Sequence, residues 1–164
     1  MVERRVRVRP PRRIHKPEAG KEKPLVVIID DDSVIRDTLN LVLRDKYRVK
    51  LCENGEDGVR TVDQTTETVV LDVKMPGMDG FEVYQKIKEN YPDVPIIFFS
   101  GFEGLSEKMQ LRKKYKPYAY FEKSGSTMEL VQVIHKAVQH YEQVSKMNQV
   151  RSRLKEISEK EKEI

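Results

Sequence analysis

The sequence predicts an α/β protein with a parallel β-sheet of five short strands. Short apolar runs, rich in β-branched and aromatic residues, recur along the chain between turn-forming residues, which is typical of buried strands. The segments between these runs are long enough for helices, and an alternation of strands and helices is typical of a parallel sheet. Four of the runs also end in a polar residue, and ligands bind outside the carboxyl ends of the strands in such sheets.

The individual elements follow from the apolar spacing and from turn residues. Strands are expected at 25–29, 47–52, 68–71, 94–100 and 118–122. Helices are expected at 34–44, 56–64, 81–90 and 105–115, and from 126 or 127 onward. Asp32 and Ser33 offer an N-cap for the first helix. The segment 74–80 contains one Pro and two Gly and is expected to be a loop.

The last helix has no predicted end, because no Gly or Pro follows Gly125. Ile134, Val138 and Tyr141 supply a face that can pack on the sheet. A second stripe has the spacing of a heptad seam and consists of Met147, Val150, Leu154, Ile157, Glu161 and Ile164. The two stripes are out of phase near Val144, which predicts a stutter or bend. Residues 144–164 are therefore a solvated, fraying helix, or else a short coiled coil or partner-docking helix.

The N-terminal segment differs from the rest in composition. Residues 1–24 contain nine Lys or Arg, three Glu and four Pro, and few apolar side chains. Such a segment cannot bury enough surface to order itself, so a disordered basic tail is expected. The alternative is an arm that binds nucleic acid, an anionic membrane surface or an acidic partner. The sequence thus predicts a tail at 1–24, a domain at 25–143 and a helical extension at 144–164.

The remaining composition limits the class of protein. Cys52 is the only cysteine among 164 residues, so no intrachain disulfide can form, and a buried position is expected for it. No apolar stretch approaches the length of a membrane span, and the N-terminus lacks the apolar part of a secretory signal. A cytoplasmic protein is therefore expected. His15, His135 and His140 are expected to be ordinary surface residues.

The polar residues at the strand ends suit one kind of chemistry. Asp30 and Asp31 follow the first strand, Asp72 the third, Ser100 the fourth and Lys123 the fifth. Three close carboxylates repel one another unless a cation neutralises them, and Mg²⁺ prefers such hard oxygen ligands. An ammonium and a hydroxyl can each pair with an oxygen of a phosphoryl group. The set therefore suits the Mg²⁺-assisted phosphorylation of an aspartate, with helix capping and a solvated strand end as the structural alternative.

Four segments within 25–143 resemble the receiver domain of two-component response regulators. They are residues 28–33 (IIDDDS), 71–80 (LDVKMPGMDG), 99–101 (FSG) and 120–123 (YFEK). The resemblance implies a flavodoxin-like, doubly wound sheet of five parallel strands in the order 2-1-3-4-5, with five helices of which the last is extended. The 2-1-3-4-5 order is a known property of such folds.

The resemblance also implies roles for the residues around the metal. Asp72 matches the phosphoacceptor, and Asp31 matches the acidic residue that binds Mg²⁺ directly. Asp30 matches the neighbour that holds a metal-bound water. Lys74 lies where a backbone carbonyl completes the metal site. A third acid, Asp32, is more simply the cap of the first helix.

The resemblance also implies roles for residues that contact the phosphoryl group or change conformation on activation. Ser100 matches the hydroxyl residue that reaches the phosphoryl oxygen, Lys123 the lysine that pairs with it, and Tyr120 the aromatic residue that changes rotamer on activation. Ser124 follows Lys123 at a position where the family usually has Pro, often with a cis peptide bond before it. A cis peptide bond before a residue other than Pro is costly, so a trans bond between Lys123 and Ser124 is expected. Gly101 leaves room for the phosphoryl group.

The positions two residues after Asp72 and Ser100 modulate the hydrolysis of the aspartyl phosphate in the family. Lys74 and Phe102, which stand there, can screen the phosphoryl group from water. We therefore expect a phosphoryl group that lasts for minutes or more.

The function implied is phosphorelay signalling. A histidine kinase or phosphotransfer protein would donate to Asp72, and the switch would act on the surface of the helix at 105–115, the strand at 118–122 and the last helix. That surface would bind a downstream protein or a second copy, and the terminal helix is another candidate for a homodimer. The chain is expected not to be a dedicated enzyme. An aspartyl-phosphate phosphatase needs a second carboxylate just after the nucleophile, where Val73 and Lys74 stand. The remaining alternative is a nucleic-acid-binding adaptor that acts through residues 1–24.

Overall fold

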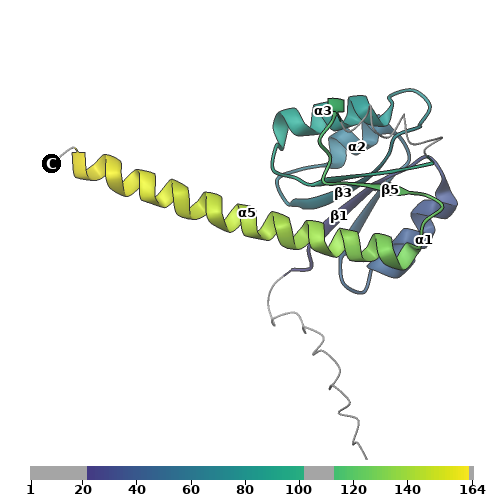
Figure 1. The fold of residues 1–164 in the computed structure, drawn as a ribbon, viewed down its shortest axis with the longest axis horizontal. Helices are drawn as coiled ribbons and strands as arrows, with labels where there is room; N and C mark the ends of the chain where they lie inside the picture. Colours follow the sequence, from purple (N-terminus) through teal and green to yellow (C-terminus); the bar gives the residue numbers. More distant parts are fainter. Residues whose placement is uncertain (1–21, 102–112, 163–164) are drawn as a thin grey trace, which may run out of the picture.

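The computed structural model describes residues 22–101 and 113–162 and shows a single parallel sheet with helices on both faces (Figure 1). The strands are β1 Leu25–Ile29, β2 Arg48–Cys52, β3 Thr66–Asp72, β4 Ile96–Ser100 and β5 Ala119–Glu122. The helices are α1 Ser33–Leu43, α2 Gly55–Thr61, α3 Gly80–Asn90 and α5 Thr127–Lys162. All neighbouring strands are parallel and their order is β2-β1-β3-β4-β5, which confirms the predicted fold and strand order.

The core consists of two apolar layers, one on each face of the sheet. Alternate residues of the central strands point to opposite faces, so Val27 and Ile29 of β1 join the layer under α2 and α3, whereas Val26 and Ile28 join the layer under α1 and α5. Because β1, β3 and β4 are covered on both faces, nearly all of their residues are buried, and the apolar residues follow one another instead of alternating with polar ones. Cys52 is buried and free, as predicted.

Some boundaries differ from the predicted ones for local reasons. Helix α2 ends at Thr61, three residues early, because a turn stabilised by Asp63 follows it: the Asp63 carboxylate accepts hydrogen bonds from the backbone N–H and the hydroxyl of Thr65. Strand β4 begins at Ile96, since Pro95 before it has no N–H for a ladder. Of the helix expected at 105–115, only 113–115 belong to the described residues, and 113 and 114 are helical.

Helix α5 is the most unusual element, with 36 residues and a length of about 54 Å. Leu130, Ile134, Ala137 and Val138 are buried against the sheet, and the helix then continues far beyond the domain (Figure 1). It passes Val144 as one uninterrupted helix, drawn straight in Figure 1, so of the predicted stutter or bend only the bend is wrong. The second stripe simply lies on another face of the same helix. Within the described residues, no helix is both long and apolar enough to span a membrane.

The chain before β1 is described only from residue 22. Arg48 of β2 pairs with Glu22 at 3.3 Å, and its Nε donates to the Lys23 carbonyl at 3.1 Å. The Lys23 ammonium donates to the Arg44 carbonyl at 3.2 Å. The predicted disorder and the nucleic-acid-binding role of residues 1–24 concern residues that otherwise lie outside the described part of the chain, so both stay predictions.

Candidate functional site

The carboxyl ends of β1, β3, β4 and β5 bring the predicted polar residues to one edge of the sheet. Asp30 follows β1, and its N–H donates to the Cys52 carbonyl at 3.1 Å, which extends the ladder by one residue. Asp72 ends β3 and Ser100 ends β4. The Lys123 N–H donates to the Ser100 carbonyl at 3.2 Å, so this residue is held directly beyond the end of β5. The register of the sheet therefore assembles residues that are far apart in the sequence.

Three carboxylates form an acidic cluster at this edge. Asp30, Asp31 and Asp72 each offer an oxygen, and these oxygens all lie within 4.8 Å of one another. Asp30 and Asp72 are buried, with 1% and 2% of their surface exposed, whereas Asp31 is exposed. Asp72 Oδ1 accepts a hydrogen bond from the Lys74 N–H at 3.1 Å. The cluster thus combines two buried acids with one that faces solvent.

Lys123 joins the two buried carboxylates. Its Nζ lies 2.9 Å from Asp30 Oδ2 and 3.0 Å from Asp72 Oδ2. The peptide bond to Ser124 is trans, as expected, since the described residues contain no cis bond. One ammonium therefore offsets part of the charge of two buried acids, which leaves an excess of negative charge.

The pKa values follow from this arrangement. Burial raises the pKa of Asp72, the hydrogen bond from Lys123 lowers it, and the charge of Asp30 raises it again, with a net result of about 6. Burial lowers the pKa of Lys123, but its close contacts with the carboxylates of Asp30 and Asp72 and their charges outweigh burial, so the pKa of Lys123 is raised. The ionised form of Asp72 is thus less favourable in the folded chain than in water, and an added cation would stabilise it.

The residues present fit a Mg²⁺ ion. Asp30 Oδ2 is buried and makes no hydrogen bond of acceptable geometry, although Lys123 Nζ lies within ion-pair distance. An oxygen with unused lone pairs in an acidic cluster is a suitable partner for a metal ion or its bound water. Carboxylate oxygens are also the ligands that Mg²⁺ prefers. The role of the Lys74 carbonyl stays a prediction.

The Ser100 hydroxyl is a second unused polar group. The residue is 1% exposed, and Oγ has no hydrogen-bond partner among the described residues. A buried hydroxyl without a partner costs free energy and is rare, which points to a ligand. At Gly101, an added Cβ would meet nothing within 4 Å in the described part of the chain, which is consistent with space beside the strand end.

Tyr120 lies on β5 in partly buried surroundings. Its ring packs edge-on against Phe98 with 5.5 Å between the centroids, and its hydroxyl donates to the Tyr115 carbonyl at 3.1 Å. In the register of β4 and β5, Phe98 lies opposite Tyr120 and Ser100 opposite Glu122. The tyrosine is therefore two residues along the strand from the site edge, and its change of rotamer stays a prediction.

The structure adds residues that the sequence did not single out. Arg36 Nη1 donates to the Asp30 carbonyl at 2.7 Å and so supports the first acid. At Gly80, an added Cβ would lie 2.3 Å from the Asp72 carbonyl oxygen and 2.5 Å from Val73 Cα. Only glycine allows α3 to begin this close to Asp72. Its position at the end of the 71–80 motif is the signal that could have identified it.

The structure also bears on the predictions made for Asp32, the histidines and Phe102. Asp32 is the N-cap of α1, as predicted, and its side chain accepts from the N–H groups of Val34 and Ile35. His135 is exposed and lies 3.0 Å from the Tyr47 hydroxyl rather than in the site. Phe102 lies outside the described residues, so its screening role is untested.

The comparisons with known proteins agree with this geometry. The family model for the response regulator receiver domain matches residues 26–135. The DNA-binding transcriptional regulator NtrC of Proteus hauseri is 27% identical over 140 residues, which are 84% of this chain and 29% of that protein. Transcriptional regulatory protein AfsQ1 of Streptomyces coelicolor is 40% identical over 80 residues, 48% of this chain and 35% of that protein.

A solved structure shows the same fold. A response regulator receiver domain protein from Clostridium thermocellum superimposes with a TM-score of 0.66 at 22% identity, covering 73% of this chain and 98% of that chain. The chain spans about a third of the length of the two curated relatives, so their activities as whole proteins do not transfer to it directly.

Proposed function

Since the chain belongs to the family of response regulator receiver domains, we propose that it accepts a phosphoryl group on Asp72 in phosphorelay signalling. The donor is a histidine kinase or a histidine phosphotransfer protein. The observation that carries the proposal is the convergence of Asp72, the Lys123 ammonium and the unpartnered Ser100 hydroxyl at one edge of the sheet. These are the groups that an aspartyl phosphate needs around it.

The transfer requires an ionised Asp72. One carboxylate oxygen attacks phosphorus, an O–P bond forms, and the N–P bond of the phosphohistidine breaks as its electron pair returns to the imidazole. Asp30, Asp31 and Asp72 would hold Mg²⁺, with the Lys74 carbonyl completing the set, and the ion supplies positive charge beside the phosphoryl oxygens. The protein is then a phosphoacceptor that promotes its own phosphorylation and dephosphorylation, not a dedicated enzyme.

The residues around Asp72 then change partners. Lys123 Nζ, now 3.0 Å from Asp72 Oδ2, pairs with a phosphoryl oxygen, and the Ser100 hydroxyl donates to another. Both moves draw the ends of β4 and β5 toward the phosphoryl group. Tyr120 on β5 changes rotamer and alters the surface of β5, α5 and residues 105–115, which binds a downstream protein. Lys74 and Phe102 slow hydrolysis, so that the phosphoryl group lasts for minutes.

Other roles have no comparable support in the described residues. Binding of nucleic acid through the N-terminal tail and a homodimer through the β5–α5 surface remain alternatives. A cytoplasmic location is part of the proposal, because it is where we expect the phosphodonor to act.

Beryllofluoride, an analogue of the phosphoryl group, tests the proposal. We expect the full chain to bind it only with Mg²⁺ present, with NMR shifts at Ser100 and Tyr120, and we expect no binding in EDTA or in Asp72→Asn. Ser100→Ala should weaken binding by about tenfold, because a hydrogen bond to a charged group is lost. Ser124→Ala, which removes an exposed hydroxyl at the same edge, is the matched control and should bind like the native chain. Equal binding by Asp72→Asn would refute the proposal.

A further inference from the structure

The part of α5 beyond the domain carries an uncovered apolar stripe. Met147, Val150, Leu154 and Ile157 are each more than half exposed, at 54%, 57%, 61% and 55%. Their spacing of three, four and three residues places them along one side of the helix, in the a and d positions of a heptad seam. In proteins, most of the stability of a helix comes from the packing of its amphipathic face rather than from helix propensity, so an uncovered apolar stripe invites a partner.

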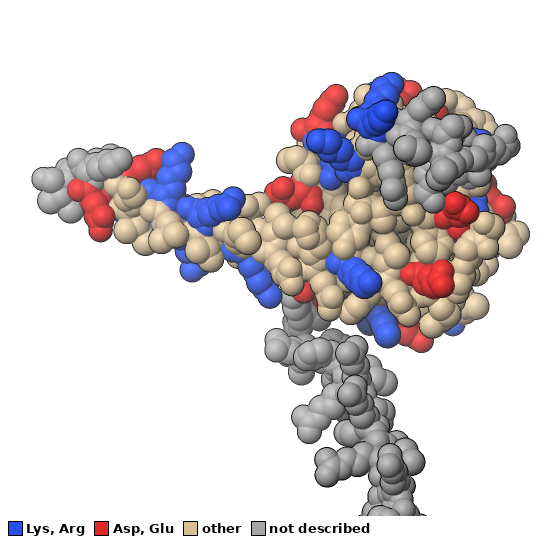
Figure 2. Space-filling model, in the orientation of Figure 1, with Lys and Arg blue, Asp and Glu red and all other residues tan. Residues whose placement is uncertain are grey.

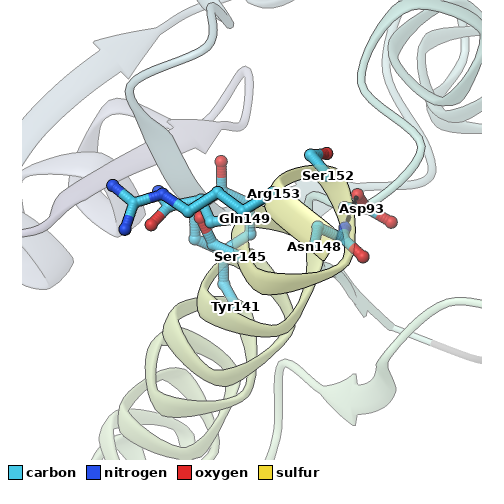
Figure 3. Close-up of a pocket in the computed structure, with 7 residues that line it drawn as sticks. All are labelled: Asp93, Tyr141, Ser145, Asn148, Gln149, Ser152 and Arg153. Atoms are coloured by element: carbon cyan, nitrogen blue, oxygen red, sulfur yellow. Dashed lines mark hydrogen bonds between the residues drawn. The ribbon is translucent and has the colours of Figure 1, made fainter. Parts of the chain in front are cut away.

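The domain does not cover this stripe, because it contacts the opposite side of the helix. The Asn148 amide donates to the Asp93 carboxylate at 2.9 Å, beside the polar groove in Figure 3. The groove is lined by Asp93, Tyr141, Ser145, Asn148, Gln149, Ser152 and Arg153. At 3.6 residues per turn, Asn148 and Ser152 lie about 160° around the helix from Val150. The polar side of α5 therefore faces the domain, and the apolar stripe faces outward.

Cations flank the stripe on both sides. Lys146, Arg153 and Lys160 recur every seven residues along one side, in the g positions, and Arg151 lies on the other side in an e position, followed by Ser158. Arg153 also lines the groove in Figure 3, so it stands at the border between the outward and the domain-facing sides. None of these cations forms an ion pair with another residue in the described part of the chain. Figure 2 shows Lys and Arg side chains recurring along the projecting helix, with acidic ones toward its outer end.

Glu156 and Glu159 lie away from this seam, whereas Glu161 occupies the next a position, at the outer end of the apolar stripe. Glu159 pairs with Lys155 at 3.8 Å on the far side of the helix. We name Met147, Val150, Leu154 and Ile157, together with the flanking Lys146, Arg151, Arg153 and Lys160, the outer face of α5.

A second copy of the chain is a poor occupant of the outer face. In a parallel pair, Lys146 would oppose Arg151 of the other copy, since g positions face e positions. In an antiparallel pair, g faces g and e faces e, which again sets cations against cations. Two heptads of apolar contact would have to overcome this repulsion, so a homodimer through the terminal helix, one of the candidates from the sequence, is disfavoured.

A lipid surface also fits poorly. Interfacial helices present a broad apolar face with aromatic residues, whereas this stripe is a narrow seam and no aromatic residue follows Tyr141. The excess of cations in the extension suits an anionic lipid surface and an acidic helix alike, so the narrow seam and the missing aromatic residues decide against the lipid. A protein helix matches both the width of the stripe and its charges.

We propose that the outer face of α5 binds an acidic amphipathic helix of another protein in a heteromeric coiled coil. The partner helix has apolar residues at its a and d positions and Glu at its e and g positions. Apolar burial then provides the association, and Glu side chains opposite Lys146, Arg151, Arg153 and Lys160 select the partner. The proposal does not rest on phosphorylation of Asp72, so the two can fail separately.

Two synthetic three-heptad helices test this with the full, unphosphorylated chain. Both carry Ile at a and Leu at d, and they differ only in Glu or Lys at e and g. Fluorescence anisotropy should show that the Glu peptide binds at least about tenfold more tightly than the Lys peptide, with a difference that shrinks as salt rises. Equal affinity for the two peptides would overturn the proposal.

Variants of the chain separate the apolar and the charged contributions to peptide binding. Leu154→Gln with Ile157→Gln should abolish binding of the Glu peptide. Lys146→Glu with Arg151→Glu and Lys160→Glu should reverse the preference toward the Lys peptide. Lys155→Glu, on the far side of the helix, is the control and should change the affinity less than about twofold. Because all these side chains are exposed, the circular dichroism of the variants should match the native chain.

Two further outcomes would also overturn the proposal of a heteromeric coiled coil. One is a stable homodimer in sedimentation that the Glu peptide does not disrupt and that Leu154→Gln with Ile157→Gln dissociates. The other is binding to phosphatidylserine vesicles together with no binding to either peptide.

Discussion

Asp72→Asn is expected to make the metal-free protein more stable at neutral pH and to have a much smaller effect in acid. The pKa of Asp72 is about 6 in the folded chain, against an ordinary value of 3.8. Between these values the folded state binds more protons than the unfolded state, so stability falls as pH rises through this window. Asn has no such titration. From pH 4 to pH 7.5, the unfolding free energy of the variant relative to the native chain should rise by about 2 to 3 kcal/mol.

Urea unfolding in EDTA at several pH values measures this difference. The exposed Asp37→Asn on α1 is the matched control and should show no comparable trend with pH. Saturating Mg²⁺ should shrink the gap between Asp72→Asn and the native chain, because the cation stabilises the ionised cluster. If the difference in unfolding free energy between Asp72→Asn and the native chain did not change between pH 4 and pH 7.5, burial would not destabilise the ionised Asp72 carboxylate.

Gly80→Ala is expected to destabilise the domain by at least about 2 kcal/mol and to displace Asp72, the proposed phosphoacceptor. The new methyl group would lie 2.3 Å from the Asp72 carbonyl oxygen, which is backbone and cannot turn aside. The start of α3 or the end of β3 must therefore move, although alanine is the better helix former. Denaturant unfolding gives the loss of stability, and the rate of phosphorylation by acetyl phosphate gives the effect on the site.

Gly101→Ala provides the comparison for Gly80→Ala. It lies at the neighbouring strand end, where an added Cβ meets nothing within 4 Å among the described residues. The unfolding free energy of Gly101→Ala should stay within about 0.5 kcal/mol of that of the native chain. If both variants were equally stable, the close packing of α3 on Asp72 would not be a real constraint.

Sequence alone predicted the fold because its signals are local and strong. The run Leu25–Ile29 and the other apolar runs identify buried strands, and the polar residue after each run identifies the edge where ligands bind. Asp32 was predicted as a cap for the same local reason. The strand order was not local information and came from the resemblance to a family.

The parts that sequence missed depend on packing between distant segments. That Lys123 joins Asp30 and Asp72 at once follows from the register of β4 and β5, which apolar spacing does not reveal. The support of Asp30 by Arg36 depends on how α1 lies over the sheet. The bend that was one alternative at Val144 was wrong because an apolar stripe can move to another face of a straight helix without any break in the backbone.

Phosphorelay signalling by this chain requires that Asp72 becomes an acyl phosphate. Acetyl phosphate and Mg²⁺ added to the full chain, followed by intact mass spectrometry, test it most directly. We expect one adduct of about 80 Da on the native chain, none on Asp72→Asn, and none in EDTA. An adduct of the same mass and yield on Asp72→Asn, or none on the native chain, would contradict the account.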